Sequence, residues 1–294
     1  MREAAQVLVD AVSVGGLYAL TALGIGMIFG VMRLVNFAHA DLITFAGYAI
    51  LLFFAQSTAL AVVGAALAAI VLALITERAA FRPLRGANPE TLLVSSFAVS
   101  FFLEKTLIMV VGARPKAVDF LPGLARQVDV AGVRLQLLHL VTIAVSLALL
   151  AGTTWLLRGT RLGLEMRAAA ENFRMAEALG VRANRVIAAA FAISGLLAAA
   201  VACMIVAQTG LVQPRMGLQL VVIAFVGTVI GGLGSLPGVA IGGFFVGVGS
   251  ILLQALLPEA LRPFREAFVF VVVALVLIVR PLGLFPSRSL RQRI

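Results

Sequence analysis

Charged side chains are scarce in this sequence of 294 residues, because Asp, Glu, Lys and Arg together make up only 12% of it. Soluble globular domains carry about a quarter charged and about half apolar residues. This chain is instead 62% hydrophobic, with a mean hydropathy of +1.11. A larger core does not explain the excess, because the surface of a soluble protein still needs polar groups. The composition therefore excludes a soluble domain and predicts a protein that crosses a membrane several times.

Cysteine and lysine are also nearly absent. Cys203 is the single cysteine and lies in an apolar run, which excludes an internal disulfide and is typical of a small buried hydrophobe. Lys105 and Lys116 are the only lysines, so arginine carries most of the positive charge behind the formal net charge of +10. The arginines lie between apolar segments, as cytoplasmic loops of membrane proteins require. We therefore expect no nucleic-acid partner.

Motifs for energy coupling and catalysis are missing too. The chain contains no G-x-x-x-x-G-K-[ST] sequence, and therefore no P-loop ATPase site of its own, and no H-E-x-x-H zinc motif. Outside residues 33–41, the ionisable groups in or near apolar segments are Asp10, Glu104 and Lys105, which are few for an ion-coupled carrier. Glu104 and Lys105 are adjacent, so they should point about 100° apart on a helix and not pair. We predict no enzyme, metal or cofactor in this chain.

Apolar residues gather in about nine segments with the length of a membrane-spanning helix, the second of them short. The segments are roughly 6–32, 41–56, 59–76, 91–112, 136–157, 186–208, 218–234, 238–257 and 266–280. They predict an all-α polytopic membrane protein of about eight to nine transmembrane helices. We expect a single transmembrane domain over 1–294.

Basic residues favour one orientation of these helices. With the N-terminus outside, the cytoplasmic segments receive the larger share of the arginines, and the C-terminus lies in the cytoplasm. The richest of these segments is the loop 158–185. The apolar run at 4–32 far exceeds the signal-peptide core of about 7–15 residues. We therefore expect it to be an uncleaved transmembrane helix.

A polar cluster interrupts the apolar sequence in FGVMRLVNFAHADL, residues 29–42, where Arg33, Asn36, His39 and Asp41 fall close together. Polar groups at membrane depth occur only where protein or a wet cavity surrounds them. Two interpretations stay open. The segment is a plain cytoplasmic turn in which Arg33 reaches the interface, or it is a helix break with a folding or functional role carried by Asn36, His39 and Asp41.

Glycines at four-residue spacing mark the segment VGTVIGGLGSLPGVAIGGFFVGVG, residues 226–249. Small residues at this spacing allow helices in lipid to approach closely. Ser235 to Gly238 has the composition of a turn between two such helices. The residues expected to serve helix packing and this turn are Gly227, Gly231, Gly234, Pro237, Gly238 and Gly242.

The loop 158–185 reads RGTRLGLEMRAAAENFRMAEALGVRANR and has a helical pattern. Its apolar residues recur at roughly helical spacing, with Glu and Arg between them, and Gly180 follows where a helix should end. The pattern predicts one amphipathic helix over about 164–179. Such a helix either rests on lipid headgroups or is presented to a cytoplasmic protein. The missing energy source favours the second interpretation.

Three stretches resemble one known family. The segment 171–180, with AEALG at 176–180, is similar to the EAA-type coupling loop of ABC-transporter permeases. GLYALTALGIGMIFGVMRLVNFAHADLITFAGY (16–48) and GTVIGGLGSLPGVAIGGFFVG (227–247) resemble signatures of branched-chain amino acid permeases of the LivH type. Order and spacing are shared over nearly the whole chain. One departure is Ala40, where that family commonly has glycine.

The resemblance implies the membrane-spanning permease subunit of a bacterial ABC importer in the inner membrane. It implies as partners two ABC ATPase subunits that bind the ATP, a second permease subunit of the LivM type, a periplasmic solute-binding protein and membrane lipid. It also implies that the segment at about 164–180 transmits ATPase motion, and that Asn36, His39 and Asp41 hold the start of the second span near the translocation path. The residues expected to couple to the ATPase are Arg167, Glu171, Ala176, Glu177, Ala178 and Gly180.

Several alternatives stay open at this point. The family most often imports leucine, isoleucine or valine, but similar permeases import urea, short amides or aromatic acids. The second permease is either a different chain or a copy of this one, and contact between the polar cluster and the substrate is open. A stand-alone channel or secondary carrier is the rival class, but it explains neither the Arg/Glu-rich helix nor the scarcity of intramembrane ionisable groups.

Overall fold

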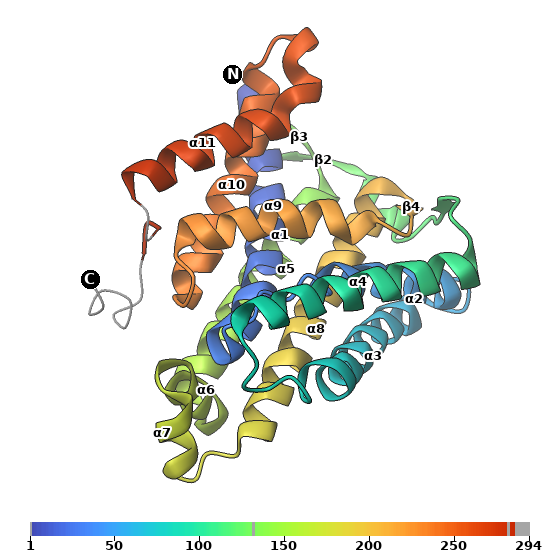
Figure 1. Cartoon of the computed structure of the whole chain (residues 1–294). Coiled ribbons are helices and arrows are strands. Elements are labelled where there is room, and N and C mark those ends of the chain that lie inside the picture. Colours follow the sequence, from blue (N-terminus) through green and yellow to red (C-terminus); the bar gives the residue numbers. More distant parts are fainter. Residues whose placement is uncertain (1, 131–132, 281–282, 286–294) are drawn as a thin grey trace. The chain divides into compact units, whose positions relative to one another are not determined.

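The computed structural model describes residues 2–130, 133–280 and 283–285, and helices dominate it (Figure 1). The α-helices are α1 (Arg2–Met32), α2 (His39–Phe53), α3 (Thr58–Thr76), α4 (Pro89–Val111), α5 (Leu137–Gly159), α6 (Arg161–Glu171), α7 (Phe173–Ala178), α8 (Ala183–Thr209), α9 (Met216–Gly231), α10 (Leu236–Leu256) and α11 (Arg265–Val279). The short elements are the π-helical turn η1 (Glu77–Phe81), the 3-10 turns η2 (Pro122–Ala125) and η3 (Glu259–Phe264), and strands β1 (Lys116–Ala117), β2 (Gln127–Val130), β3 (Val133–Gln136) and β4 (Leu211–Val212).

Each apolar segment predicted from the sequence corresponds to a helix in this part of the chain, which confirms the all-α membrane fold. Among the described residues, six helices are long and apolar enough to cross a bilayer, namely α1, α3 extended through η1, α4, α5, α8 and α10. Helices α2 and α9 are apolar but shorter, with 15 and 16 residues. The second segment is therefore short, as predicted: its helix begins at His39, after the polar linker, and ends at Phe53.

One compact unit contains residues 1–23, 121–150 and 222–294, and its described part holds the glycine-rich segment. Small residues bring its helices into backbone contact: a side chain at Gly227 would meet Gly243, and one at Gly247 would meet Gly15. Between α9 and α10 the chain turns through Gly232 and Gly234, with φ of +100° and +96°. The Ser235 hydroxyl then accepts a hydrogen bond of 3.3 Å from the Gly238 amide and so caps α10.

Pro237 and Gly238 occupy the first turn of α10. A side chain at Gly231 would meet the carbonyl of Gly238, and one at Gly242 would meet the carbonyl of Gly227. The structure thus places Gly227, Gly231, Gly238 and Gly242 in the contact between α9 and α10 and Gly234 at the turn, whereas Pro237 lies inside α10, because the turn comes earlier than predicted, at 232–235. Elsewhere in this unit, Asp10 and His139 lie within hydrogen-bond distance, with Oδ1 and Nδ1 2.5 Å apart.

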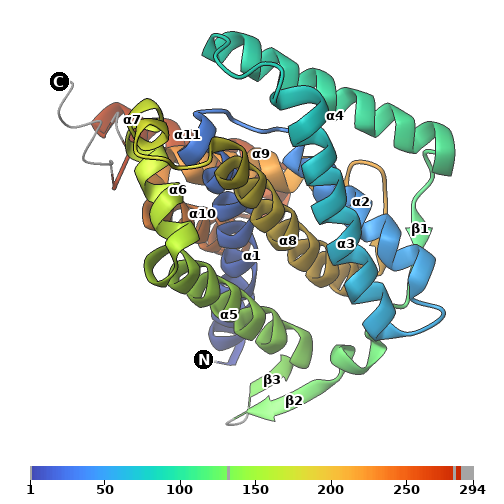
Figure 2. The ribbon, with the colours of Figure 1, turned by 90° about the horizontal axis from the view of Figure 1, so that it is seen from below.

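The other unit contains residues 24–120 and 151–221, and α8 packs in it against α2 and α3 (Figure 2). Gly195 of α8 lies so close to α3 that a Cβ there would be 2.8 Å from the carbonyl oxygen of Ala69. About one turn away along α8, the rings of Phe191 and Phe81 of η1 are 5.6 Å apart. Strands β1 and β4 pair antiparallel, with Lys116 opposite Val212. This unit positions the polar cluster and the coupling loop.

Two local predictions are wrong. The loop does not form one helix over 164–179, because the chain is extended at Asn172 and divides the segment into α6 and α7. Glu104 and Lys105 do pair: Nζ of Lys105 lies 3.2 Å from Oε1 of Glu104, and Nε of Arg215 lies 2.9 Å from the same oxygen. The long lysine side chain spans the angular separation that the helix imposes. The expectation of one permease domain stays a prediction.

Candidate functional site

The polar linker between α1 and α2 has an unusual backbone. The Arg33 amide donates the last hydrogen bond of α1, 2.8 Å to the carbonyl of Phe29, and Arg33 itself has φ of +56°. Non-glycine residues rarely adopt this left-handed conformation. Asn36, which is 1% exposed, accepts a hydrogen bond of 3.1 Å at Oδ1 from the Ala38 amide. The linker is thus an ordered helix break, which favours the second of the two interpretations drawn from the sequence.

His39 begins α2 and is completely buried. Its Nδ1 lies 3.0 Å from Oγ of Ser194 on α8, which joins two helices by a hydrogen bond. On the other side the imidazole lies against Gly24 of α1, where a Cβ atom would be 2.7 Å from Nε2. Glycine at position 24 therefore provides the room for the ring. Within the described part of the chain, His39 Nε2 and Asn36 Nδ2 are buried without a hydrogen-bond partner.

Asp41 and Thr44 extend the contacts of α2. The Ser100 hydroxyl of α4 donates to Oδ2 of Asp41 over 2.5 Å, and Asp41 is 5% exposed. The Gly217 amide, at the start of α9, donates to Oγ1 of Thr44 over 3.3 Å. Gly217 also lies directly against the carbonyl of Ala40. The first two turns of α2 therefore hold α4, α8 and α9 through buried polar contacts. The predicted residues Asn36, His39 and Asp41 all lie at this place in the fold.

Helix α6 folds tightly onto the last turn of α5. Thr160 caps α6, since its Oγ1 accepts from the Gly163 amide over 3.1 Å. Gly163 lies against the carbonyls of Leu156 and Leu157, where a Cβ atom would clash. The Arg167 guanidinium donates to the Leu157 carbonyl. Arg167 therefore orients α6 on α5, a role that helical periodicity did not indicate.

The break at Asn172 starts a second helix. Its backbone is extended, with φ of −150° and ψ of 100°, and its Oδ1 accepts from the Met175 amide over 3.1 Å, as an N-cap does. Asparagine is among the preferred N-cap residues, so the signal was present in the sequence. The apolar periodicity continues through this position and hid it.

Gly180 ends α7 with φ of +91°. The Val181 amide donates to the Ala176 carbonyl over 3.0 Å, and the Gly180 amide to the Glu177 carbonyl over 2.9 Å. This pair of hydrogen bonds is a Schellman motif, which requires a left-handed residue at the position of Gly180. Ala176 is buried, at 3% exposure, beneath this turn. Gly180 thus directs the chain from α7 into α8.

The outer side of α6 and α7 combines acidic and apolar side chains. Glu171, Glu177 and Ala178 are exposed. Three large apolar side chains, Leu164, Met175 and Leu179, are 60%, 58% and 80% exposed. Exposed apolar groups among charges are typical of a protein-binding surface. We call these six residues the outer face of the loop.

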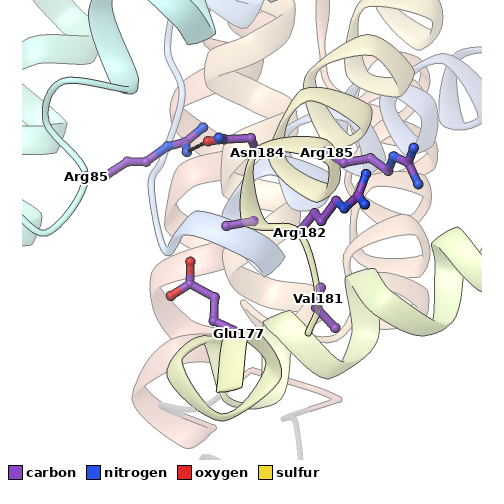
Figure 3. A pocket seen from close by; sticks show the side chains of 7 residues that line it. Arg85, Glu177, Val181, Arg182, Asn184 and Arg185 are labelled. Carbon is purple, nitrogen blue, oxygen red and sulfur yellow. Dashed lines mark hydrogen bonds between the residues drawn. The ribbon is translucent and has the colours of Figure 1, made fainter. Parts of the chain in front are cut away.

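An open hollow lies beside Glu177 (Figure 3). Arg182, Arg185 and Asn184 line it from the start of α8, and Arg85 reaches it from the segment that precedes α4. Arg85 donates to Asn184 and pairs with Glu77 of η1. The hollow is basic apart from Glu177. Arg85 was not among the residues predicted from the sequence, because only the fold brings it to the loop.

The described residues contain no group of three or more His, Cys, Asp or Glu side chains that could hold a metal ion. What the geometry offers is a charged surface on a broken loop helix and a buried polar anchor at the start of α2. With six bilayer-length helices among its described residues, the chain is a multi-pass helical membrane protein.

The chain belongs to the family described as branched-chain amino acid transport system / permease component, whose match covers residues 7–280. It is 31% identical to the high-affinity branched-chain amino acid transport system permease protein BraD of Pseudomonas aeruginosa, over 95% of this chain and 94% of that protein. It is 30% identical to LivH of Salmonella typhimurium, over the same shares. A probable LivH of Methanocaldococcus jannaschii is 24% identical over 95% of this chain and 91% of its own length.

These findings confirm the resemblance read from the sequence stretches. The chain is a transport permease of this family and a multi-pass membrane protein.

Proposed function

We propose that this chain is the membrane-spanning permease subunit of a bacterial ABC importer that moves branched-chain, hydrophobic amino acids across the inner membrane. The family match over residues 7–280 is the observation that carries the proposal. Permeases named for branched-chain amino acids align with nearly the whole chain, which favours this substrate class over urea, short amides and aromatic acids.

The proposed partners supply what the sequence lacks. Two ABC ATPase subunits bind the ATP, because this chain has no P-loop motif. A periplasmic solute-binding protein delivers the amino acid, and a second permease subunit of the LivM type completes the path. Hydrolysis shifts the permease pair between inward-open and outward-open states, because the ATP-bound ATPase dimer contacts the two states differently.

The geometry divides the predicted coupling residues into two groups with different proposed roles. Glu171, Glu177 and Ala178 are exposed on the outer face of the loop and would contact the ATPase. Arg167, Ala176 and Gly180 would shape the loop: Arg167 bonds the end of α5, Ala176 is buried, and Gly180 sets the turn. The basic hollow next to Glu177 would add positive charge to the same contact surface.

The proposed orientation places α6 and α7 in the cytoplasm. The loop's arginines support this side, since positive residues collect in cytoplasmic loops. The same orientation puts the C-terminus in the cytoplasm, although residues 286–294 lie outside the described part of the chain.

Co-purification tests the proposed function. The tagged chain, extracted from its native host in mild detergent, is expected to bring down a P-loop ATPase and a second permease, identified by mass spectrometry. Reconstituted with its binding protein, the complex should take up leucine, isoleucine or valine only in the presence of ATP. Recovery of the chain alone, under conditions that keep known ABC complexes intact, would contradict the proposal and favour a channel or secondary carrier.

The start of α2 is proposed to be an anchor of the translocation path. His39→Ala is expected to lower uptake about tenfold. The substitution leaves the buried Ser194 hydroxyl without its partner, which costs about 1–3 kcal/mol. Ser194→Ala should give a similar loss of uptake. The double variant should be no worse than either single variant, because each substitution removes the same hydrogen bond between His39 and Ser194.

Ser95→Ala is the matched control for Ser194→Ala, because the Ser95 hydroxyl donates to the Thr91 carbonyl of its own helix and so joins no second helix among the described residues. Uptake of labelled leucine and the amount of chain in the membrane are measured together. Unchanged uptake and expression in His39→Ala would show that the anchor role is wrong.

A further inference from the structure

Arg33 occupies a backbone conformation that suits glycine better. Its φ is +56°, and only Arg33 and Leu121 among the described non-glycine residues have a positive φ. A non-glycine residue in this region raises the conformational energy, so it persists only where the surroundings stabilise it. An exposed arginine held there points to a role for its side chain.

The Arg33 side chain contacts α6. Its Nη2 donates a hydrogen bond of 3.2 Å to the carbonyl of Ala170, which is 137 residues away in sequence. Ala170 lies in the last turn of α6, where helix carbonyls have no partner in their own helix. The break at Asn172 leaves this carbonyl available. The positive guanidinium also suits the negative end of the helix dipole.

The linker that follows Arg33 is attached to α4. The Ser96 hydroxyl donates to the Val35 carbonyl over 3.0 Å, and the Phe37 amide donates to Ser96 Oγ over 3.5 Å. The Phe37 ring stacks on Phe97, with centroids 4.1 Å apart. Residues 35–38 of the linker are therefore held by hydrogen bonds and ring stacking, so a displacement at one end would either reach the other end or break these contacts.

We propose that Arg33 is the positioning residue that transmits movement of α6 to the start of α2. This inference rests on the proposed function, in which the ATPases move α6 and α7. When α6 shifts, the guanidinium draws the linker with it, and the linker turns the His39 end of α2, which holds α4, α8 and α9. Arg33 touches neither nucleotide nor substrate in this role.

The test uses the whole importer, reconstituted in proteoliposomes with its ATPases, second permease and binding protein. Leucine uptake and ATP hydrolysis are measured on the same vesicles. Arg33→Ala is expected to keep its ATPase subunits and hydrolyse ATP, while leucine taken up per ATP falls about fivefold, as for residues on a coupling network. Arg33→Lys keeps the charge and the stem, so it should restore part of the ratio.

Two further variants separate the side chain from other effects. Arg33→Gly relieves the backbone conformation but lacks the guanidinium, so it should resemble Arg33→Ala. Arg78→Ala removes another exposed arginine that the orientation places in the cytoplasm, and it should couple like the wild type.

The proposal is overturned if Arg33→Ala or Arg33→Gly couples normally, or if the lost uptake follows loss of the ATPase subunits. In those cases the wild-type importer still supports the proposed function. A wild-type complex that takes up no amino acid overturns both.

Discussion

Replacing Gly180 by valine is expected to abolish amino-acid uptake while the chain still inserts into the membrane. Gly180 has φ of +91°, and no heavy atom lies within 4 Å of a Cβ built there, so conformation and not space forbids a side chain. Strain of this kind costs about 1–3 kcal/mol, and a β-branched residue is the least suited to it. The Schellman turn would open, and α7 would lose its direction into α8. Transport should fall more than about tenfold, since 1.4 kcal/mol corresponds to that factor.

Membrane insertion should survive because the strain lies at the end of a six-residue helix outside the six long apolar helices. Gly152→Val is the matched control: it adds the same side chain in α5, also with no neighbour within 4 Å, at a helical glycine without positive φ. Gly180→Asn should retain part of the uptake, because asparagine tolerates left-handed conformations. Uptake, membrane content and recovery of the ATPases are measured for each. Normal uptake by Gly180→Val would exclude this turn from coupling.

Replacing Gly217 by valine should have an effect of similar size through a different cause. Gly217 is the second residue of α9 and lies against the carbonyl oxygen of Ala40, and a Cβ there would also lie 3.1 Å from the Ala40 Cα. Backbone atoms inside a helix contact cannot turn aside as a side chain can. Overpacking typically costs about 1–3 kcal/mol, and more where backbone blocks relaxation. The start of α9 would separate from α2, and the Gly217–Thr44 hydrogen bond would be lost.

The distinguishing result is that Gly217→Ala should already reduce uptake and heat resistance, because the first carbon of the side chain causes the clash. Gly249 of α10 has no neighbour within 4 Å, so Gly249→Ala and Gly249→Val should both be tolerated. Heating detergent-solubilised samples and measuring the remaining monodisperse protein tests stability, and leucine uptake tests function. Full tolerance of Gly217→Ala would show that α2 and α9 do not depend on this contact.

Helix positions were predictable because lipid imposes a simple rule. Every backbone amide in hydrocarbon must be satisfied within its own segment, so apolar runs of sufficient length become helices. The ends followed from local signals: Pro237 and Gly238 mark the start of α10, and Gly180 marks the end of α7. The family resemblance came from the stretches 16–48, 171–180 and 227–247, and the family match over residues 7–280 confirmed it.

The internal structure of the loop was less predictable. Asn172 carried an N-cap signal, but the apolar spacing of its neighbours agreed with one continuous helix. Arg167 looks in sequence like any other exposed arginine, and only the packing of α6 on α5 turns its guanidinium to the Leu157 carbonyl. Periodicity describes one helix at a time. It contains no information on which other helix end lies within hydrogen-bond distance of a side chain such as that of Arg167.

The sequence by itself determined that this is a helical membrane protein, where its apolar helices lie, that it has no P-loop motif and which family it resembles. These properties depend on composition and on residues close together along the chain. Only the tertiary structure decided the partners of the polar cluster, namely Ser194 for His39, Ser100 for Asp41 and Ala170 for Arg33. Each of those contacts joins residues more than 50 positions apart, and their geometry depends on how α2, α4, α6 and α8 pack, which no local pattern specifies.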